Sequence, residues 1–137
     1  MVDGGRNEVV VFNEFRVEGG YGYVSEKYID LLVLYCHASK RYERAAYEVK
    51  VSRRDFNREL RKPLKRWVGM LFTNRFYFAA PEGLIKRSEV PDDCGLVEVD
   101  ESGAAKVSIK APWRESRQPT WPFVVSLARR VVDVEGE

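Results

Sequence analysis

Two acidic residues and one lysine are spaced in a way that suits phosphodiester chemistry. Asp30 opens an apolar stretch, and Glu48 and Lys50 occur later in the segment Glu-Val-Lys. Side chains alternate along a strand, so we expect Glu48 and Lys50 on the same face. If the strand of Asp30 pairs with theirs, two carboxylates and one ammonium meet at an edge of that face. Carboxylates are ligands for Mg²⁺, and such a group serves metal-assisted hydrolysis of a phosphodiester.

This spacing also has a simpler interpretation, because Glu and Lys two residues apart on a strand usually belong to a solvated face. Asp30 argues for the functional interpretation, since it stands between Ile29 and the apolar run 31–34, where an unpaired acid is costly. The peptide carbonyl of Val49 is a candidate third metal ligand. We expect Lys50 to orient or help deprotonate a metal-bound water and to offset charge on the phosphate.

A basic segment follows directly after Lys50. Cations greatly outnumber acids from there to Arg66, although the formal net charge of the chain is only +2. Basic charge gathered on one element is typical of a surface that contacts a phosphate backbone, but a solvated helix face gives the same pattern. The candidate DNA contacts are Arg53, Arg54, Arg58, Lys62 and Lys65.

Hydrophobic periodicity predicts the elements that position these residues. We expect strands over 8–17, with a kink near Asn13, over 29–35 and over 44–51. The glycines of 19–22 mark a turn or loop. The run 29–35 is continuously apolar, which favours a central strand buried on both faces. The strands over 29–35 and 44–51 are expected to form a hairpin.

A helix is expected after these strands, with Ser52 as its N-cap and a kink or break at Pro63. Further along the chain we expect a strand over 76–80, a hairpin formed by 96–99 and 105–110, and a closing helix over 123–132. This order predicts an α/β fold, a mixed sheet flanked by helices, in a single domain covering 1–137.

Composition limits the class of protein. The chain has 137 residues, of which 45% are hydrophobic and 32% charged, as in a globular domain. No apolar run reaches the roughly 20 residues of a membrane helix, so we expect no membrane partner. Cys36 and Cys94 have no metal-binding spacing, and the first residues are polar. We therefore expect a cytoplasmic protein with reduced thiols and no secretory signal.

The motif order resembles that of the PD-(D/E)xK nuclease superfamily. Asp30 matches the Asp of that motif, and Glu48-Val49-Lys50 matches its (D/E)xK. The segment YEVKVSRRDFNREL (47–60) is similar to a segment of the MmcB-like DNA-repair proteins, and 74–85 and 89–104 also resemble that group. The resemblance covers residues 26–105.

This resemblance implies a restriction-endonuclease-like core and cleavage of DNA, in repair or recombination. It also implies Mg²⁺, with Mn²⁺ as the alternative, held by Asp30 and Glu48, and Lys50 as the catalytic lysine. Small domains of the superfamily often act as dimers, so a homodimer is a further expectation, although the sequence shows no dimer surface.

The chain departs from the family pattern in two ways. Family cores usually begin with a helix that carries another acid, and the sequence before Ser25 predicts no such helix. Glu14 is our candidate for that carboxylate and metal ligand, with Glu26 a weaker one. The motif's leading Pro is also absent before Asp30. A DNA-binding module without catalysis therefore stays open, as does a non-enzymatic protein-interaction domain.

Overall fold

The part of the chain that the structure describes forms a mixed sheet in which six strands follow one another in chain order. The computed structural model describes residues 8–17 and 27–136, so the turn expected at 19–22 and the candidate Glu26 lie outside the described residues. The strands are β1 (Val9–Val17), β2 (Lys27–Tyr35), β3 (Arg44–Val49), β4 (Arg75–Pro81), β5 (Gly95–Val99) and β6 (Ala105–Ile109). Neighbouring strands are antiparallel except for β3 with β4 and β4 with β5, which are parallel.

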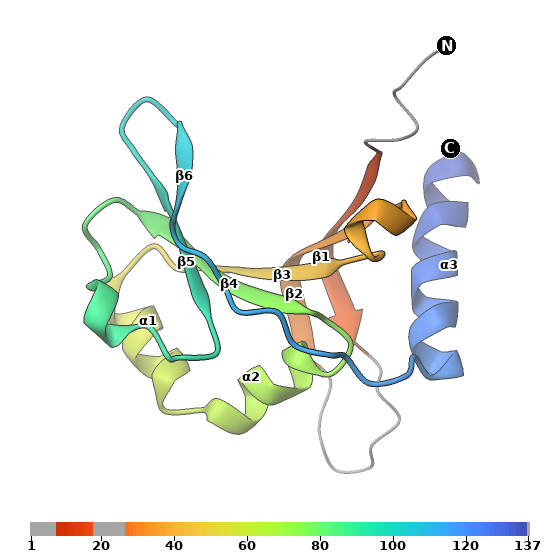
Figure 1. Ribbon diagram of the computed structural model, residues 1–137, viewed down its shortest axis with the longest axis horizontal. Helices are drawn as coiled ribbons and strands as arrows, with labels where there is room; N and C mark the ends of the chain where they lie inside the picture. The colour runs from red at the N-terminus through yellow and green to blue at the C-terminus, as the bar shows by residue number, and fades with distance from the viewer. Residues whose placement is uncertain (1–7, 18–26, 137) are drawn as a thin grey trace.

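Helices flank this sheet, as the sequence predicts. α1 (Arg53–Leu60) and α2 (Pro63–Met70) form the crossover between the parallel strands β3 and β4, and Figure 1 shows them together on one side of the sheet. α3 (Trp121–Gly136) lies beside β1 at the other end (Figure 1). Short 3-10 turns occur at η2 (Ala38–Lys40) and η3 (Arg87–Glu89). Within the two described ranges, no helix is long and apolar enough to cross a membrane.

The start of α1 is fixed by its own sequence. The Ser52 hydroxyl accepts a hydrogen bond from the backbone N–H of Asp55 at 3.1 Å, which satisfies a donor that the first helical turn leaves open. Phe56 is fully buried and packs edge-on against Phe78 of β4, with ring centroids 5.3 Å apart. The predicted break is confirmed, because α1 ends before Pro63 and α2 begins there. At the first position of a helix the backbone N–H has no partner within the helix, so proline, which has no N–H, fits there.

A cluster of buried aromatic and aliphatic side chains forms the core between the sheet and the helices. Phe12, Phe15, Leu32, Phe76 and Leu96 supply the strand side of this cluster. Phe12 and Phe15 are both buried although they are three residues apart, which a regular strand would not allow. Glu14 between them has a φ of 47°, so the predicted kink is present one residue after Asn13.

The second strand differs from the prediction. Leu32 of β2 is fully buried, but Leu31 and Val33 line an open hollow of about 650 Å³ on the opposite face of the sheet. The expected burial on both faces is therefore wrong for this face. An apolar run shows that both faces are apolar, but it does not show whether another layer covers each of them.

Candidate active site

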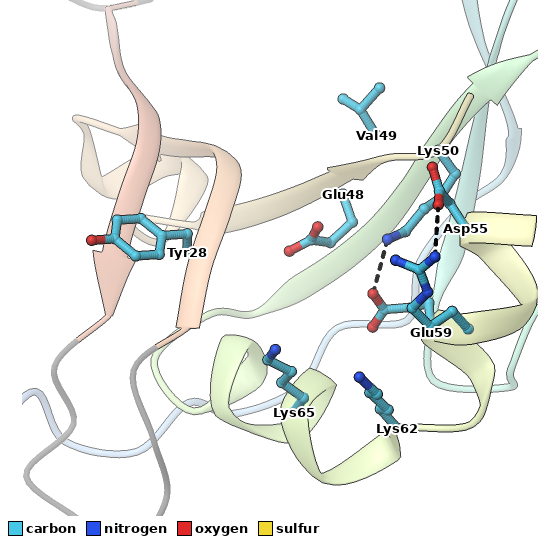
Figure 2. Close-up of a pocket in the computed structure, with 9 residues that line it drawn as sticks. Tyr28, Glu48, Val49, Lys50, Asp55, Glu59, Lys62 and Lys65 are labelled. Carbon is cyan, nitrogen blue, oxygen red and sulfur yellow. Dashed lines mark ion pairs between the residues drawn. The ribbon is translucent and has the colours of Figure 1, made fainter. Parts of the chain in front are cut away.

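A cleft of about 430 Å³ opens beside the end of β3, between that strand and the crossover helices (Figure 2). Several of the candidate site residues from the sequence line it. Its lining residues are Tyr28, Glu48, Val49, Lys50, Asp55, Arg58, Glu59, Lys62 and Lys65.

Glu48 is a buried acid on the wall of this cleft. Its side chain lies on the same face of β3 as the buried Ala46 and is 4% exposed. Figure 2 shows its carboxylate directed into the space between β3 and the start of α2. An acid so far out of water is not a solvated surface charge, so Glu48 is a candidate for chemistry in the cleft.

Asp30 is held next to the Glu-Val-Lys segment. The β2–β3 register ends with Leu31 opposite Tyr47, so Asp30 and Glu48 occupy the next positions along the two strands. The Asp30 carboxylate accepts a hydrogen bond through Oδ2 from the backbone N–H of Val49 at 2.8 Å. It therefore links the two strands at the point where their ladder stops. Asp30 itself does not line the cleft.

Lys50 forms an ion pair across the cleft wall. It follows the last residue of β3, and its backbone N–H still bonds to the Ala79 carbonyl at 2.9 Å. Its ammonium lies 3.0 Å from Oε1 of Glu59, and the two side chains are 14% and 8% exposed. Glu59 is not among the site residues predicted from the sequence. The signal was its position three residues after Phe56, on the buried face of α1.

Three cations predicted to contact DNA line the cleft. Arg58 comes from α1, Lys62 directly precedes α2 and Lys65 lies in the first turn of α2. Figure 2 shows Lys62 and Lys65 extending from α2 towards the side of the cleft where Glu48 lies. The 3.8 Å pair of Arg58 with Asp55 is about half exposed, so it contributes little to stability. These cations make a basic rim around the buried acid.

Two other arginines predicted to contact DNA lie outside the cleft lining. Arg54 is exposed on α1. The Arg53 guanidinium donates two hydrogen bonds to Glu89, at 2.7 and 2.6 Å, and a third to the Leu84 carbonyl at 3.1 Å. Arg53 therefore ties the start of α1 to the segment around η3.

Glu14 does not line the cleft either. Its exposed side chain borders a second hollow of about 270 Å³, together with Arg16, Arg129 and Arg130, and this hollow shares Tyr28 with the cleft. The turn of the backbone at Glu14 places it near these arginines rather than in the lining that contains Glu48. In this conformation Glu14 does not complete a carboxylate cluster.

The stabilisation that comes from the Arg53–Glu89 pair is expected to depend on pH. Hydrogen bonds from Arg53, and from the backbone N–H of Lys86, lower the pKa of Glu89 from 4.5 to about 2. Because the folded pKa is the lower one, this stabilisation is full above pH 4.5 and is lost as the pH falls towards 2. In Arg53→Ala we expect the Glu89 pKa to rise towards 4.5, measured by NMR titration of its carboxyl carbon. An unchanged midpoint would show that the Lys86 N–H alone sets the pKa.

The donor set is compatible with a hard divalent cation. Within the described ranges, no group of three or more His, Cys, Asp or Glu side chains is arranged to hold a metal. Mg²⁺ does not need such a group, since it keeps several waters and binds through one or two carboxylates together with substrate phosphates. Asp30 and Glu48, with the Val49 carbonyl, supply donors of that kind beside the basic rim.

The fold has a counterpart among known structures. No family model and no curated protein matches the chain. The chain shares its fold with a protein of unknown function. That protein is the SPO1766 protein of Silicibacter pomeroyi, which is 22% identical, with a TM-score of 0.58. The match covers 94% of this chain and 83% of that one, so the likeness in fold extends over most of both chains.

Proposed function

We propose that this chain is a metal-dependent nuclease that hydrolyses DNA phosphodiester bonds at the cleft beside β3. The observation that carries the proposal is the placement of the buried acid Glu48 and of Lys50 in one cleft with a rim of three cations. A phosphate group needs charge neutralisation at the bond that breaks and a basic surface for the flanking backbone. The resemblance of the Asp30 and Glu48-Val49-Lys50 pattern to the PD-(D/E)xK motif supports the same reaction.

The residues divide into three roles. Asp30, Glu48 and the Val49 carbonyl would hold Mg²⁺, or Mn²⁺ in its place, which when bound acts as a Lewis acid and lowers the pKa of a water. Lys50 presents its ammonium at the cleft wall, where it donates hydrogen bonds to a phosphate oxygen and offsets negative charge as it develops. The cations of the basic rim bind the neighbouring phosphates.

Cleavage of single-stranded, duplex and branched DNA tests this proposal, with Mg²⁺, Mn²⁺ or EDTA present. We expect cutting with either metal and none in EDTA, because the carboxylates alone do not activate water. The branch and strand preferences would then identify the substrate. Absence of cutting on all three DNAs with both metals would refute the nuclease.

A DNA-binding module without catalysis is the second candidate. It is favoured by the Lys50–Glu59 ion pair, which uses part of the ammonium, and by the position of Glu14 outside the cleft lining. It predicts DNA binding that weakens as salt rises, with no turnover in metal. The two candidates share the basic rim and differ in the roles they give to the acids and to Lys50.

Replacing Lys62 and Lys65 together by alanine is expected to weaken DNA binding by a similar factor on different sequences. Each lost phosphate contact should reduce the slope of log affinity against log salt by about 1. Fluorescence anisotropy in EDTA at several salt concentrations measures both quantities. Arg54→Ala is the control for loss of one cation elsewhere, since Arg54 is an exposed cation on α1 outside the cleft lining. Equal losses in the control and the double variant would contradict a specific rim.

A further inference from the structure

Glu59 is a buried acid in the cleft to which the proposed reaction gives no role. Its Oε1 lies 3.0 Å from the Lys50 ammonium. Its Oε2 is buried and has no hydrogen-bond partner among the described residues. Among the residues with described positions, the carboxylate is therefore held through Oε1, by Lys50.

The helix that carries Glu59 does not depend on this contact for its position. Ser52 caps its first turn, and Phe56 anchors it against Phe78 of β4. A nearly buried ion pair also gains little net stability, because taking both charges out of water costs about as much as their attraction returns. The pair is therefore better explained by what it does to the geometry of the cleft than by stability.

The geometry of the pair restricts the lysine. A lysine side chain has four rotatable bonds before its ammonium, so the ammonium of a surface lysine moves freely. Here the ammonium is fixed to the wall by Glu59, on the side of the cleft that faces α1, while Glu48 lies on the strand side (Figure 2). Only part of the ammonium is used by Glu59, so the remaining N–H groups are available to the cleft.

We propose that Glu59 is a positioning residue, which fixes the Lys50 ammonium so that its remaining N–H groups face the phosphate in the cleft. This inference rests on the proposed function, because it assigns Glu59 a part in the same reaction. Glu59 acts through Lys50 and does not itself touch the substrate. Without it the ammonium is still present but is no longer held in one orientation.

Glu59→Gln tests the proposal by removing the charge while keeping the shape of the side chain. We expect kcat for DNA cleavage to fall about a hundred-fold, the size of effect that misplacing a catalytic group has, with KM for DNA unchanged. The matched control is Glu43→Gln. Glu43 pairs with Arg75 at 3.4 Å, with both side chains 17% exposed, and neither lines the cleft. We expect the control to cleave DNA at the wild-type rate.

A second readout does not depend on cleavage. In ¹H–¹⁵N spectra of the lysine ammonium groups, the Lys50 signal is identified by its absence in Lys50→Met. We expect this signal to move or broaden in Glu59→Gln and to stay unchanged in Glu43→Gln. If the wild-type chain cuts no DNA, the proposed function fails, and this signal alone then decides whether Glu59 holds the ammonium.

Three results would overturn the inference. The first is a wild-type kcat in Glu59→Gln, and the second is an equal loss of kcat in Glu59→Gln and Glu43→Gln. The third is a Lys50 ammonium signal that is unchanged in Glu59→Gln. If Glu59→Gln does not fold, Glu59→Asp replaces it. That variant keeps the charge but withdraws it by one methylene, so kcat should still fall, and a wild-type rate would equally overturn the proposal.

Discussion

Replacing Glu48 by glutamine is expected to lower metal-dependent DNA cleavage by about a hundred-fold to a thousand-fold, the range found when one group that stabilises a transition state is removed. Glu48 is 4% exposed on the cleft wall, and glutamine has nearly its shape. The substitution therefore removes the negative charge that a divalent cation needs without opening a cavity. The rate is measured under single turnover in Mg²⁺, so that product release does not mask the chemical step.

DNA binding separates this effect from a general loss of function. The cations of the basic rim are untouched in Glu48→Gln, and one nearby negative charge is gone. Binding in EDTA should therefore be as tight as in the wild-type chain or tighter. Wild-type cleavage by Glu48→Gln would remove Glu48 from the active site. Unchanged melting in the circular dichroism signal would show that the fold is intact.

Local chemistry explains why much of the fold was predictable from the sequence. Ser52 caps α1 because its hydroxyl can reach a backbone donor three residues on. Pro63 divides the crossover helix because its ring removes a donor. The pairing of β2 with β3 brings Asp30 beside Val49, and this follows from two strands joined by a short connection. Each of these features depends on residues close in the chain or on one strand pair.

The contact of Glu59 with Lys50 was not predictable from the sequence. Its pairing with Lys50 depends on how α1 crosses the end of β3, and that angle is set by the packing of Phe56 on Phe78. Arg53 is a similar case, since its partner Glu89 comes from a distant segment. A basic sequence segment does not reveal which of its cations are already neutralised by the fold. The three that line the cleft differ from Arg53 only in their tertiary neighbours.

The position of Glu14 was predicted wrongly for a different reason, the kink in β1. The sequence predicts a kink near Asn13, and the kink is present at Glu14. A kink changes which side chains share a face, so the alternation that would have carried Glu14 towards the acids no longer applies beyond it. Instead Glu14 borders the hollow near Arg129 and Arg130 of α3. The candidate site is therefore assembled around Glu48, Lys50 and Glu59, with Asp30 beside it.

Replacing Lys50 by methionine alone is expected to destabilise the fold by about 3–5 kcal/mol, the usual result of leaving one partner of a buried ion pair. Methionine keeps most of the apolar stem of lysine, so the loss comes mainly from the Glu59 carboxylate, which is 8% exposed and has lost its cation. Urea unfolding, followed by tryptophan fluorescence, gives the free energy of unfolding of both chains. Cleavage should be lost as well.

Adding Glu59→Leu to Lys50→Met should restore most of that stability, because a buried ion pair replaced by apolar side chains of similar volume is often neutral or stabilising. The double variant should still cut no DNA, since it lacks the ammonium. Comparing the single and double variants therefore separates the two consequences of losing Lys50. A double variant as unstable as Lys50→Met would place the cost in the packing of the lysine stem. A stable but inactive double variant would mean that the ion pair serves the chemistry of the cleft and adds nothing to the free energy of unfolding.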